Sequence, residues 1–209
     1  MELQKSDSGM VLDPRKQKGD FLNPEQILKS LGVEGNMKFA DFGCGAGFFT
    51  IPAARMVGEH GQIYAVDVLK SELADVASKA KIEGLLNLKT VWADLEIPRS
   101  TKLKDNSIDM VFLAHVFYQS KKPEAVLAEA KRVVKSSGRI VVLEWEKVDT
   151  PFGPPLDERV SKDEMKEMIQ QAGLEIESEF TAGSYHYGLV LRKTDDSAPS
   201  ASDTEVQYD

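Results

Sequence analysis

This chain of 209 residues is organised around a short segment that carries three glycines at alternate positions, Gly43, Gly45 and Gly47. An apolar run over residues 37–42, typical of a buried strand, precedes them, and a helical pattern over residues 48–56 follows. Glycine has no Cβ atom, so the backbone can turn sharply there and a ligand can approach it closely. The segment therefore predicts a strand, a tight loop and a helix, with a ligand held at the loop.

Apolar segments of two kinds alternate along the chain. Short, nearly continuous apolar runs are typical of strands buried on both faces, and the segments between them carry apolar residues at helical spacing. Such alternation predicts an α/β fold with a parallel, doubly wound sheet. The predicted strands cover residues 37–42, 62–67, 88–93, 108–114 and 139–143, and the predicted helices cover 24–31, 48–56, 73–80, 123–134 and 162–172.

Two of these helices have clear start signals. Asn23 is a good N-cap, and Pro24 fits the first helical position. Ser161 and Glu164 have the spacing of a capping box, and Gly173 is expected to end that helix.

The carboxyl-terminal part predicts a different arrangement. Residues 136–138 (Ser-Ser-Gly) are expected to form a turn before the fifth strand. Two further strands, over residues 174–180 and 186–192, are joined across Gly183 and predict an antiparallel hairpin at the edge of the sheet.

Composition limits the organisation of the chain. A flexible polar arm is expected over residues 1–20, one domain over 21–194 and a disordered tail over 195–209. The formal net charge is −8, and the tail contributes five acids and no base. No secretory signal or membrane-length apolar run is present, and Cys44 is the single cysteine, so a cytoplasmic protein without a multi-cysteine metal site is expected.

Two acidic residues end the next predicted strands. Asp67 lies 22 residues after Gly45 and is placed to accept the hydroxyls of a ribose, and Asp94 ends the third strand. The carboxyl ends of these strands line one crevice. A nicotinamide cofactor is the first alternative, but the bulky Phe48 occupies the position at which its glycine pattern requires a small residue. A tight turn without any ligand is the second alternative.

Taken together, these motifs resemble class I S-adenosylmethionine-dependent methyltransferases. The resemblance covers residues 22–193 and rests on residues 41–47 (DFGCGAG), 65–68 (AVDV), 93–95 (ADL), 107–111 (SIDMV) and 127–139 (LAEAKRVVKSSGR). It implies a Rossmann-like, seven-stranded sheet in the order 3-2-1-4-5-7-6, with strand 7 antiparallel and helices on both faces. It also implies S-adenosylmethionine as cofactor and S-adenosylhomocysteine as product.

The resemblance implies a role for each matching residue. Asp41 and the loop Gly43, Cys44, Gly45 and Gly47 would hold the methionine end of the cofactor. Asp67 would bind the ribose, Val68 and Leu95 would sandwich the adenine, and Asp94 would accept a hydrogen bond from its amino group. Backbone carbonyls of Leu113 and Ala114 would bind the methionine ammonium.

The acceptor side is less defined. The chain is similar to small bacterial and archaeal methyltransferases that carry a tryptophan after the fifth strand and a Gly-Pro-Pro loop with an arginine, here Trp145, residues 153–155 and Arg159. Those relatives often have Asn and His-Glu after the fourth strand, whereas this chain has His115, Tyr118 and Gln119. His115 and Tyr118 are the catalytic candidates, with His115 as a possible base.

Three further expectations concern the pocket and the side chains around it. Glu144 and Trp145 are assigned to the acceptor pocket, with a hydrophobic lid as the alternative role of Trp145. Cys44 is expected to fill space in the loop, and His186 is expected to be exposed or packed at the sheet edge. No metal is expected.

The sequence favours methyl transfer to a small molecule by in-line displacement. The Asn/Asp-Pro-Pro-Tyr motif of enzymes that methylate DNA adenine or protein glutamine is absent, and residues 114–117 are Ala-His-Val-Phe instead. Nucleic acid is therefore an unfavoured partner, and a monomer or homodimer is expected. The alternative is a regulatory protein that binds S-adenosylmethionine without catalysis, and the missing His-Glu pair supports it.

Overall fold

The computed structural model describes residues 22–194. The predictions for the arm (1–20) and for the tail (195–209) fall outside this range, and the domain boundaries remain a prediction. The elements run in the order α1 (Pro24–Ser30), β1 (Lys38–Phe42), α2 (Thr50–Val57), β2 (Gln62–Asp67), α3 (Lys70–Ile82), β3 (Leu88–Trp92), β4 (Ile108–Ala114), the 3₁₀ helix η2 (Phe117–Gln119), α4 (Pro123–Val133), β5 (Val134–Trp145), α5 (Lys162–Gln171), β6 (Leu174–Ala182) and β7 (His186–Lys193).

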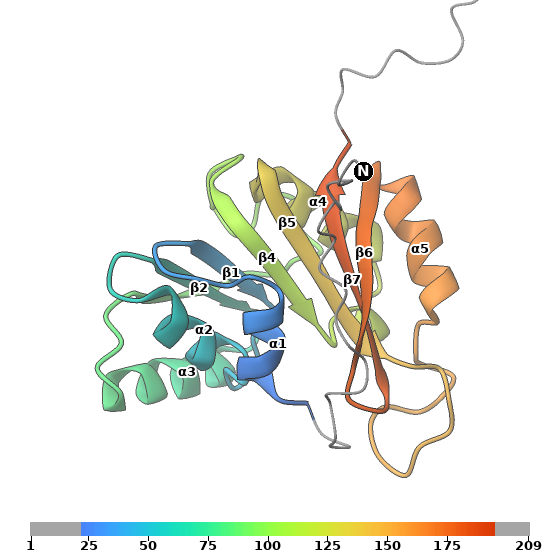
Figure 1. The fold of residues 1–209 in the computed structure, drawn as a ribbon, viewed down its shortest axis with the longest axis horizontal. Coiled ribbons are helices and arrows are strands. Elements are labelled where there is room, and N and C mark those ends of the chain that lie inside the picture. The colour runs from blue at the N-terminus through green and yellow to red at the C-terminus, as the bar shows by residue number, and fades with distance from the viewer. Residues whose placement is uncertain (1–21, 195–209) are drawn as a thin grey trace, which may run out of the picture.

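The strands form one seven-stranded sheet in the order β3-β2-β1-β4-β5-β7-β6, which confirms the predicted order (Figure 1). β1 to β5 are parallel, whereas β7 pairs antiparallel with both β5 and β6. The order reverses beside β1, so β1 and β4 are neighbours. In doubly wound sheets, ligands bind outside the carboxyl ends of the strands at such a reversal.

Helices cover both faces of the sheet, because each buried strand presents apolar side chains to both sides. On one face, α4 and α5 pack Leu127 and Ile169 against a cluster that includes Val142 and Leu191. On the other face, α1 and α2 bury side chains such as Leu28 against Phe112 and Leu143. The alternation of neighbouring residues between the two clusters is what a strand period of two requires.

The helix boundary signals are confirmed. The Asn23 side chain accepts a hydrogen bond from the Gln26 amide, and Pro24 is the first residue of α1. Ser161 and Glu164 form both hydrogen bonds of a capping box at α5, which ends before Gly173. These caps satisfy amide groups that have no partner within the helix.

The predicted turn at residues 136–138 is wrong. These residues belong to β5, which begins at Val134 directly after α4. The pairing with β4 is irregular there, because Ile108 faces Val134 but Met110 faces Arg139. Gly138 fits this bulge since a Cβ atom would lie 2.7 Å from the carbonyl oxygen of Asp109. Most other predicted bounds lie within two residues of the structure, but α3 begins at Lys70 rather than at residue 73, and β5 begins at Val134 rather than at residue 139.

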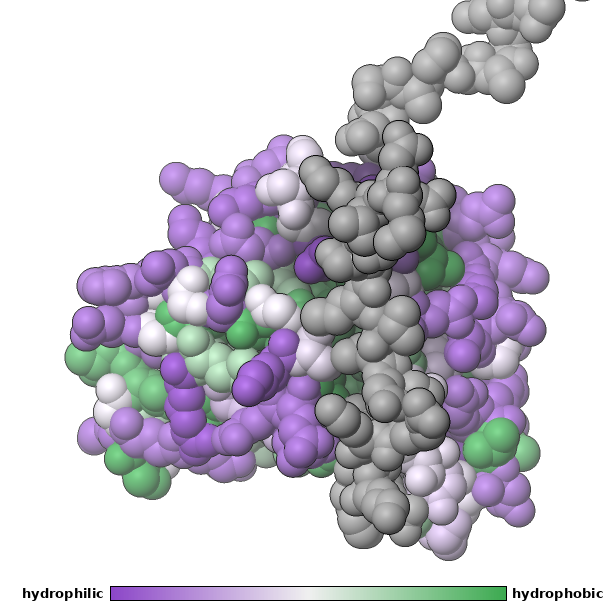
Figure 2. Space-filling view, viewed as in Figure 1, coloured by the Kyte–Doolittle hydropathy of each residue, from purple (hydrophilic) through white to green (hydrophobic). Residues whose placement is uncertain are grey.

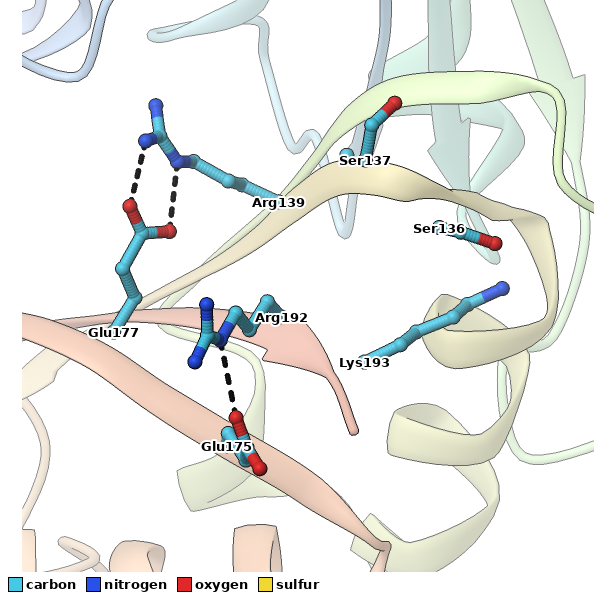
Figure 3. Close-up of a pocket in the computed structure, with 8 residues that line it drawn as sticks. Ser136, Ser137, Arg139, Glu175, Glu177, Arg192 and Lys193 are labelled. Atoms are coloured by element: carbon cyan, nitrogen blue, oxygen red, sulfur yellow. Dashed lines mark hydrogen bonds and ion pairs between the residues drawn. The ribbon is translucent and has the colours of Figure 1, made fainter. Parts of the chain in front are cut away.

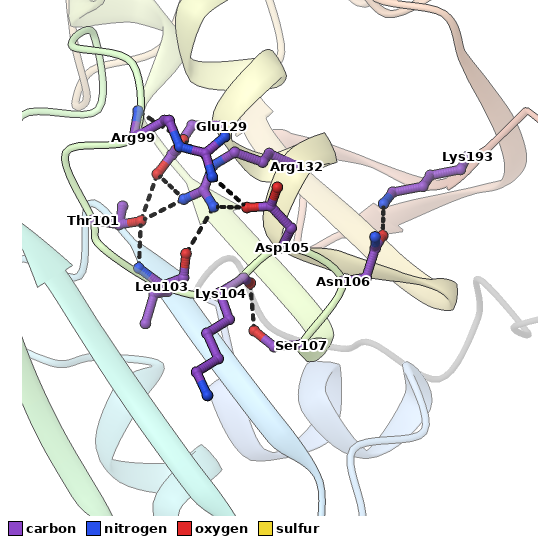
Figure 4. Close-up of polar contacts among 10 residues, drawn as sticks. All are labelled: Arg99, Thr101, Leu103, Lys104, Asp105, Asn106, Ser107, Glu129, Arg132 and Lys193. Carbon is purple, nitrogen blue, oxygen red and sulfur yellow. Dashed lines mark hydrogen bonds and ion pairs between the residues drawn. The ribbon is translucent and has the colours of Figure 1, made fainter.

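A buried ion pair ties α4 to the segment between β3 and β4 (Figure 4). Glu129 is 3% exposed, and its carboxylate accepts hydrogen bonds from Arg132, Thr101 and the amide of Arg99. Burial alone would raise the pKa of Glu129, but the bonds from Arg132 and Thr101 and the charge of Arg132 hold that pKa below its usual range. Arg132 also bonds to the carbonyl of Leu103, so this segment is anchored where β4 begins.

No helix within residues 22–194 has the length and apolar character to cross a membrane. On the face in Figure 2, hydrophilic residues form most of the outline, and hydrophobic residues show between them over the side that carries α1 to α3.

Candidate functional site

The glycine loop connects β1 to α2 at the reversal of strand order. The amides of Gly43 and Cys44 both donate to the carbonyl of Val66 at the end of β2, at 2.8 and 3.0 Å. Gly43, Gly45 and Gly47 have φ angles of 76°, 48° and 85°, in the region that favours glycine. A Cβ atom on Gly43 would lie 2.8 Å from a methyl group of Val116, so the loop also approaches the segment after β4 closely.

Asp67 joins this loop to the end of β2. Its two carboxylate oxygens accept hydrogen bonds from the amides of Gly45 (2.9 Å) and Leu69 (2.8 Å). The side chain is therefore held in one orientation beside the loop, with only 9% of the residue exposed. This is the position from which an acid can bind both hydroxyls of a ribose.

Asp41 lies beneath the loop at the end of β1. It is 2% exposed and accepts a hydrogen bond from the Thr50 hydroxyl. Burial raises the pKa of Asp41 to about 7; the Thr50 bond opposes this rise, and the nearby Asp67 charge adds to it. Because its pKa is close to 7, a positive charge placed beside this carboxyl group would stabilise its ionised form.

Cys44 packs in a small cluster with Ala65, Leu73 and Val76. Burial, together with the charges of Asp41 and Asp67, raises the pKa of its thiol. The thiol is therefore protonated and unreactive at neutral pH, so a space-filling side chain is what the geometry supports.

The residues expected around the adenine come directly after the carboxyl ends of β2 and β3. Val68 is 55% exposed, whereas Leu95 is packed in the core. Asp94 accepts a hydrogen bond from the Glu96 amide through one carboxylate oxygen, Oδ1. The exposed Trp92 donates to the carbonyl of Val68 at 2.9 Å, which adds a second apolar surface beside this position.

The end of β4 brings the catalytic candidates next to the loop. Leu113 pairs with Phe42 of β1, and His115 follows Ala114 with a φ of 59°, which is unusual for a residue with a side chain. The His115 amide donates to the carbonyl of Leu143, and the Gln119 side chain donates to the His115 carbonyl. Together these bonds hold the strained residue at the tip of the strand.

Three aromatic rings gather at this tip. The His115 ring stacks on Trp145 with centroids 5.3 Å apart, and His186 lies 4.9 Å from His115 and 4.1 Å from Trp145. Trp145 and His186 are directly paired across β5 and β7. His186 is 4% exposed and lies on β7 between β5 and β6, among the candidate residues of the site, so the expectation of an exposed or edge position is wrong.

Glu144 is buried on the opposite face of β5 from Trp145. Its carboxylate accepts the Phe117 amide at 2.7 Å, which fastens η2 to β5. Burial raises the pKa of Glu144 to about 7, although amides of Phe117, Val116 and Trp145 oppose that rise. Tyr118 is half-buried in η2; burial and then the charges of Glu144 and Glu158 raise the pKa of its phenol.

Burial lowers the pKa values of both histidines. The pKa of His115 falls to about 4 through burial and the neighbouring His186. The pKa of His186 also falls to about 4 through burial, which outweighs the opposite effect of the Ala182 backbone. Both rings are thus neutral at pH 7.

The loop after β5 packs against Trp145. Arg159 is 3% exposed and uses all five of its N–H donors within this loop. They bond to the carbonyls of Glu146, Val148, Phe152 and Pro154 and to the Thr150 hydroxyl. Gly153 lies against the indole, where a Cβ atom would be 3.0 Å from the ring. Packing and hydrogen bonds therefore hold together the predicted tryptophan, the Gly-Pro-Pro segment and the arginine.

A depression of about 480 Å³ lies elsewhere, at the amino ends of the parallel strands (Figure 3). Its charged side chains are largely paired, Arg139 with Glu177 and Arg192 with Glu175. Within residues 22–194, no three His, Cys, Asp or Glu side chains are grouped to hold a metal ion. The candidate site is therefore the carboxyl end of the sheet.

Sheet order, glycine loop and strand-end acids define a class I S-adenosylmethionine-dependent methyltransferase. A family model described as a methyltransferase domain matches residues 34–189, so the chain belongs to that family. The cradle fits S-adenosylmethionine as cofactor: three glycines with positive φ angles form its loop, Asp67 is oriented beside it, and Val68 is exposed.

Relatives agree with this class. A methyltransferase of known structure from Aquifex aeolicus is 31% identical, with a TM-score of 0.75 over 87% of this chain and 98% of its own. A type 11 methyltransferase structure from Sulfolobus solfataricus is 27% identical, with a TM-score of 0.70 over 85% and 96% of the two chains.

Curated relatives match a shorter part. Demethylmenaquinone methyltransferase from Staphylococcus aureus is 30% identical over 61% of this chain and 51% of its own length. A ubiquinone/menaquinone biosynthesis C-methyltransferase from Shewanella pealeana is 31% identical over 57% of this chain and 47% of its own length. The chain thus spans about half the length of the curated relatives that it matches.

Proposed function

We propose that this protein transfers a methyl group from S-adenosylmethionine to a small-molecule acceptor by in-line displacement. The observation that carries the proposal is the direct bond between the Gly45 amide and Asp67, because it joins the loop and the ribose acid into one ready-made cofactor cradle. The sulfonium of the cofactor supplies an already activated methyl group, so the residues of the chain need mainly to position both partners and exclude water.

The proposed roles follow the expected positions. Asp41 and the glycine loop hold the methionine end, with Leu113 and Ala114 offering backbone carbonyls, and Asp67 binds the ribose. Val68, Asp94 and Leu95 bind the adenine. His115, neutral at pH 7, can accept a hydrogen bond or a proton from the acceptor. Tyr118 keeps its proton because its pKa is raised, so it contacts the acceptor or the sulfonium and does not act as a base.

Names of the curated relatives guide the choice of acceptor. Those proteins are named for quinone methylation, so a reduced quinone is the first member of an acceptor panel. A cytoplasmic location, a monomer or homodimer, and no nucleic-acid partner belong to the same proposal and rest on the sequence arguments alone.

The test is release of S-adenosylhomocysteine from purified protein with a broad panel of small phenols, quinols, amines and thiols. We expect turnover with at least one acceptor, and relatives named as methyltransferases favour this over the binding-only alternative. Tight S-adenosylmethionine binding without turnover on any acceptor would support the regulatory alternative. Binding of NADH without binding of S-adenosylmethionine would contradict both.

Affinity for S-adenosylmethionine should depend on pH through Asp41. The pKa of Asp41 is about 7 in the cofactor-free protein, and a bound cation favours the ionised carboxylate. Asp41 is about half protonated at pH 7 and mostly protonated at pH 6, so lowering the pH from 7 to 6 should weaken binding by about fivefold, as expected for one coupled proton. Calorimetric titration from pH 5.5 to 7.5 measures this effect, together with the protons released on binding.

The matched variant for this effect is Asp41→Asn, which keeps the shape of the side chain and removes its titration. It should bind more weakly at pH 7 and lose most of the pH dependence. An unchanged pH profile in this variant would assign the effect to another group.

A further inference from the structure

Four buried side-chain atoms in the described part of the chain have no hydrogen-bond partner, and three of them belong to one cluster, formed by the neighbouring rings of His115 and His186. They are Nε2 of His115, Oε2 of Glu144 and both ring nitrogens of His186. Other buried polar side chains in this range, such as Asn87, Thr101 and Glu129, are bonded. A buried polar atom without a partner costs about 1–3 kcal/mol, so a group of them marks a place where a partner is missing.

The cluster lies beside the cofactor cradle. Its first member, His115, immediately precedes Val116, whose methyl group occupies the space next to Gly43. His186 is paired with Trp145 across the strands and stacks near His115. His115 and Trp145 are only partly buried, so the stack borders the surface at the strand ends.

The absence of charge on the two imidazoles indicates which kind of ligand they suit. Both imidazoles are neutral at pH 7, and each neutral ring offers one N–H donor and one acceptor nitrogen. Arg159 lies 5.2 Å from the Trp145 ring, but carbonyls and Thr150 already occupy all five of its donors. This cation is therefore not available to bind a carboxylate or a phosphate.

We propose that His186, together with His115, binds the methyl acceptor, and that the acceptor is an uncharged molecule with a hydroxyl group seated against Trp145. A hydroxyl both donates and accepts, which matches the unpartnered nitrogens of the two rings. The flat indole and imidazole faces suit a planar ring beside that hydroxyl. This inference rests on the proposed function, because it names the acceptor class of the same site.

The test uses full-length protein saturated with S-adenosylhomocysteine and 2-naphthol as the probe. The chain has three histidines, so ¹⁵N-histidine spectra are simple, and the exposed His60 is an internal reference. We expect the ring nitrogens of His115 and His186 to shift on titration with 2-naphthol while those of His60 stay constant. Naphthalene-2-carboxylate should bind at least about tenfold more weakly because the site offers no free cation.

Two variants separate hydrogen bonding from packing. His186→Phe keeps a ring against Trp145 and removes both nitrogens, and it should weaken 2-naphthol binding by roughly tenfold, the loss of one to two hydrogen bonds. His186→Asn restores polar atoms and should recover part of the affinity. His60→Phe is the matched control and should bind as the unmodified protein does.

The outcomes are distinct. Equal affinity of His186→Phe and unmodified protein, equal affinity for naphthol and naphthoate, or no binding of naphthol by the saturated protein would each overturn the inference. If His186→Phe does not fold, the inference is tested by the ring-nitrogen shifts of the unmodified protein and by the affinity of His186→Asn for 2-naphthol. Absence of shifts at His115 and His186 would then overturn it. Failure to bind S-adenosylhomocysteine at all would instead contradict the proposed function.

Discussion

Replacing Asp67 with alanine is expected to weaken S-adenosylmethionine binding by about 100- to 1000-fold, the loss of two charge-assisted hydrogen bonds. The variant would lose the acceptor for the ribose hydroxyls, and the Gly45 and Leu69 amides would lose the carboxylate that orients them. Both effects act in the same direction, because the loop would no longer be held in its binding conformation.

Isothermal titration with S-adenosylmethionine measures this loss. Asp67→Asn keeps the size of the side chain but has one acceptor oxygen, so we expect an intermediate loss. The control is Asp75→Ala, which removes an exposed carboxylate from α3 and should leave affinity unchanged. A change of less than threefold in Asp67→Ala would show that Asp67 does not contact the cofactor.

Replacing Glu129 with alanine is expected to lower the free energy of unfolding by about 3–5 kcal/mol, as for other buried ion pairs that lose one partner. Arg132 and Thr101 would remain largely buried without the carboxylate that accepts their hydrogen bonds. The segment between β3 and β4 would lose the bonds that Thr101 and the Arg99 amide make to α4, although no residue of the cofactor cradle is altered.

Urea unfolding at pH 7 measures this change, and Glu175→Ala is the control. Glu175 pairs with Arg192 on the surface, where a salt bridge contributes at most about 1 kcal/mol. A loss in Glu129→Ala no larger than in the control would contradict the role of the buried pair.

The pH dependence provides a second check on Glu129. Its folded-state pKa is lowered, so its contribution to stability is present above the ordinary pKa of glutamate and is lost as the pH falls through the folded value. The difference in stability between Glu129→Ala and the unmodified protein should therefore shrink in acid. A difference that stays constant would show that the loss comes from packing rather than from the charge.

Much of the fold could be read from neighbouring residues. The N-cap at Asn23, the capping box at Ser161 and the buried strands were predictable because each depends on hydrogen bonds or periodicity within a few positions. The turn at residues 136–138 was wrong for the opposite reason. A local Ser-Ser-Gly pattern favours a turn, but pairing with β4 draws these residues into a bulged strand.

The candidate site divides in the same way. The glycines, Asp41, Asp67 and Asp94 could be located because strand ends in a parallel sheet meet at one edge. Their roles in binding remain predictions. The position of His186 beside Trp145 and His115 was missed, since these residues lie far from it in the chain. Only the register of the antiparallel pair β5 and β7 places Trp145 opposite His186.

The sequence by itself determined which segments form strands and helices, which loop is rich in glycine and which acids end the strands, because these depend on local geometry and on the period of apolar residues. Only the tertiary structure decided which side chains share one environment. It paired Trp145 with His186, left four polar atoms buried without partners and turned Arg159 into the centre of the loop after β5. The three alternating glycines matter at both levels, because they let the loop after β1 turn sharply enough to contact Asp67 and Val116.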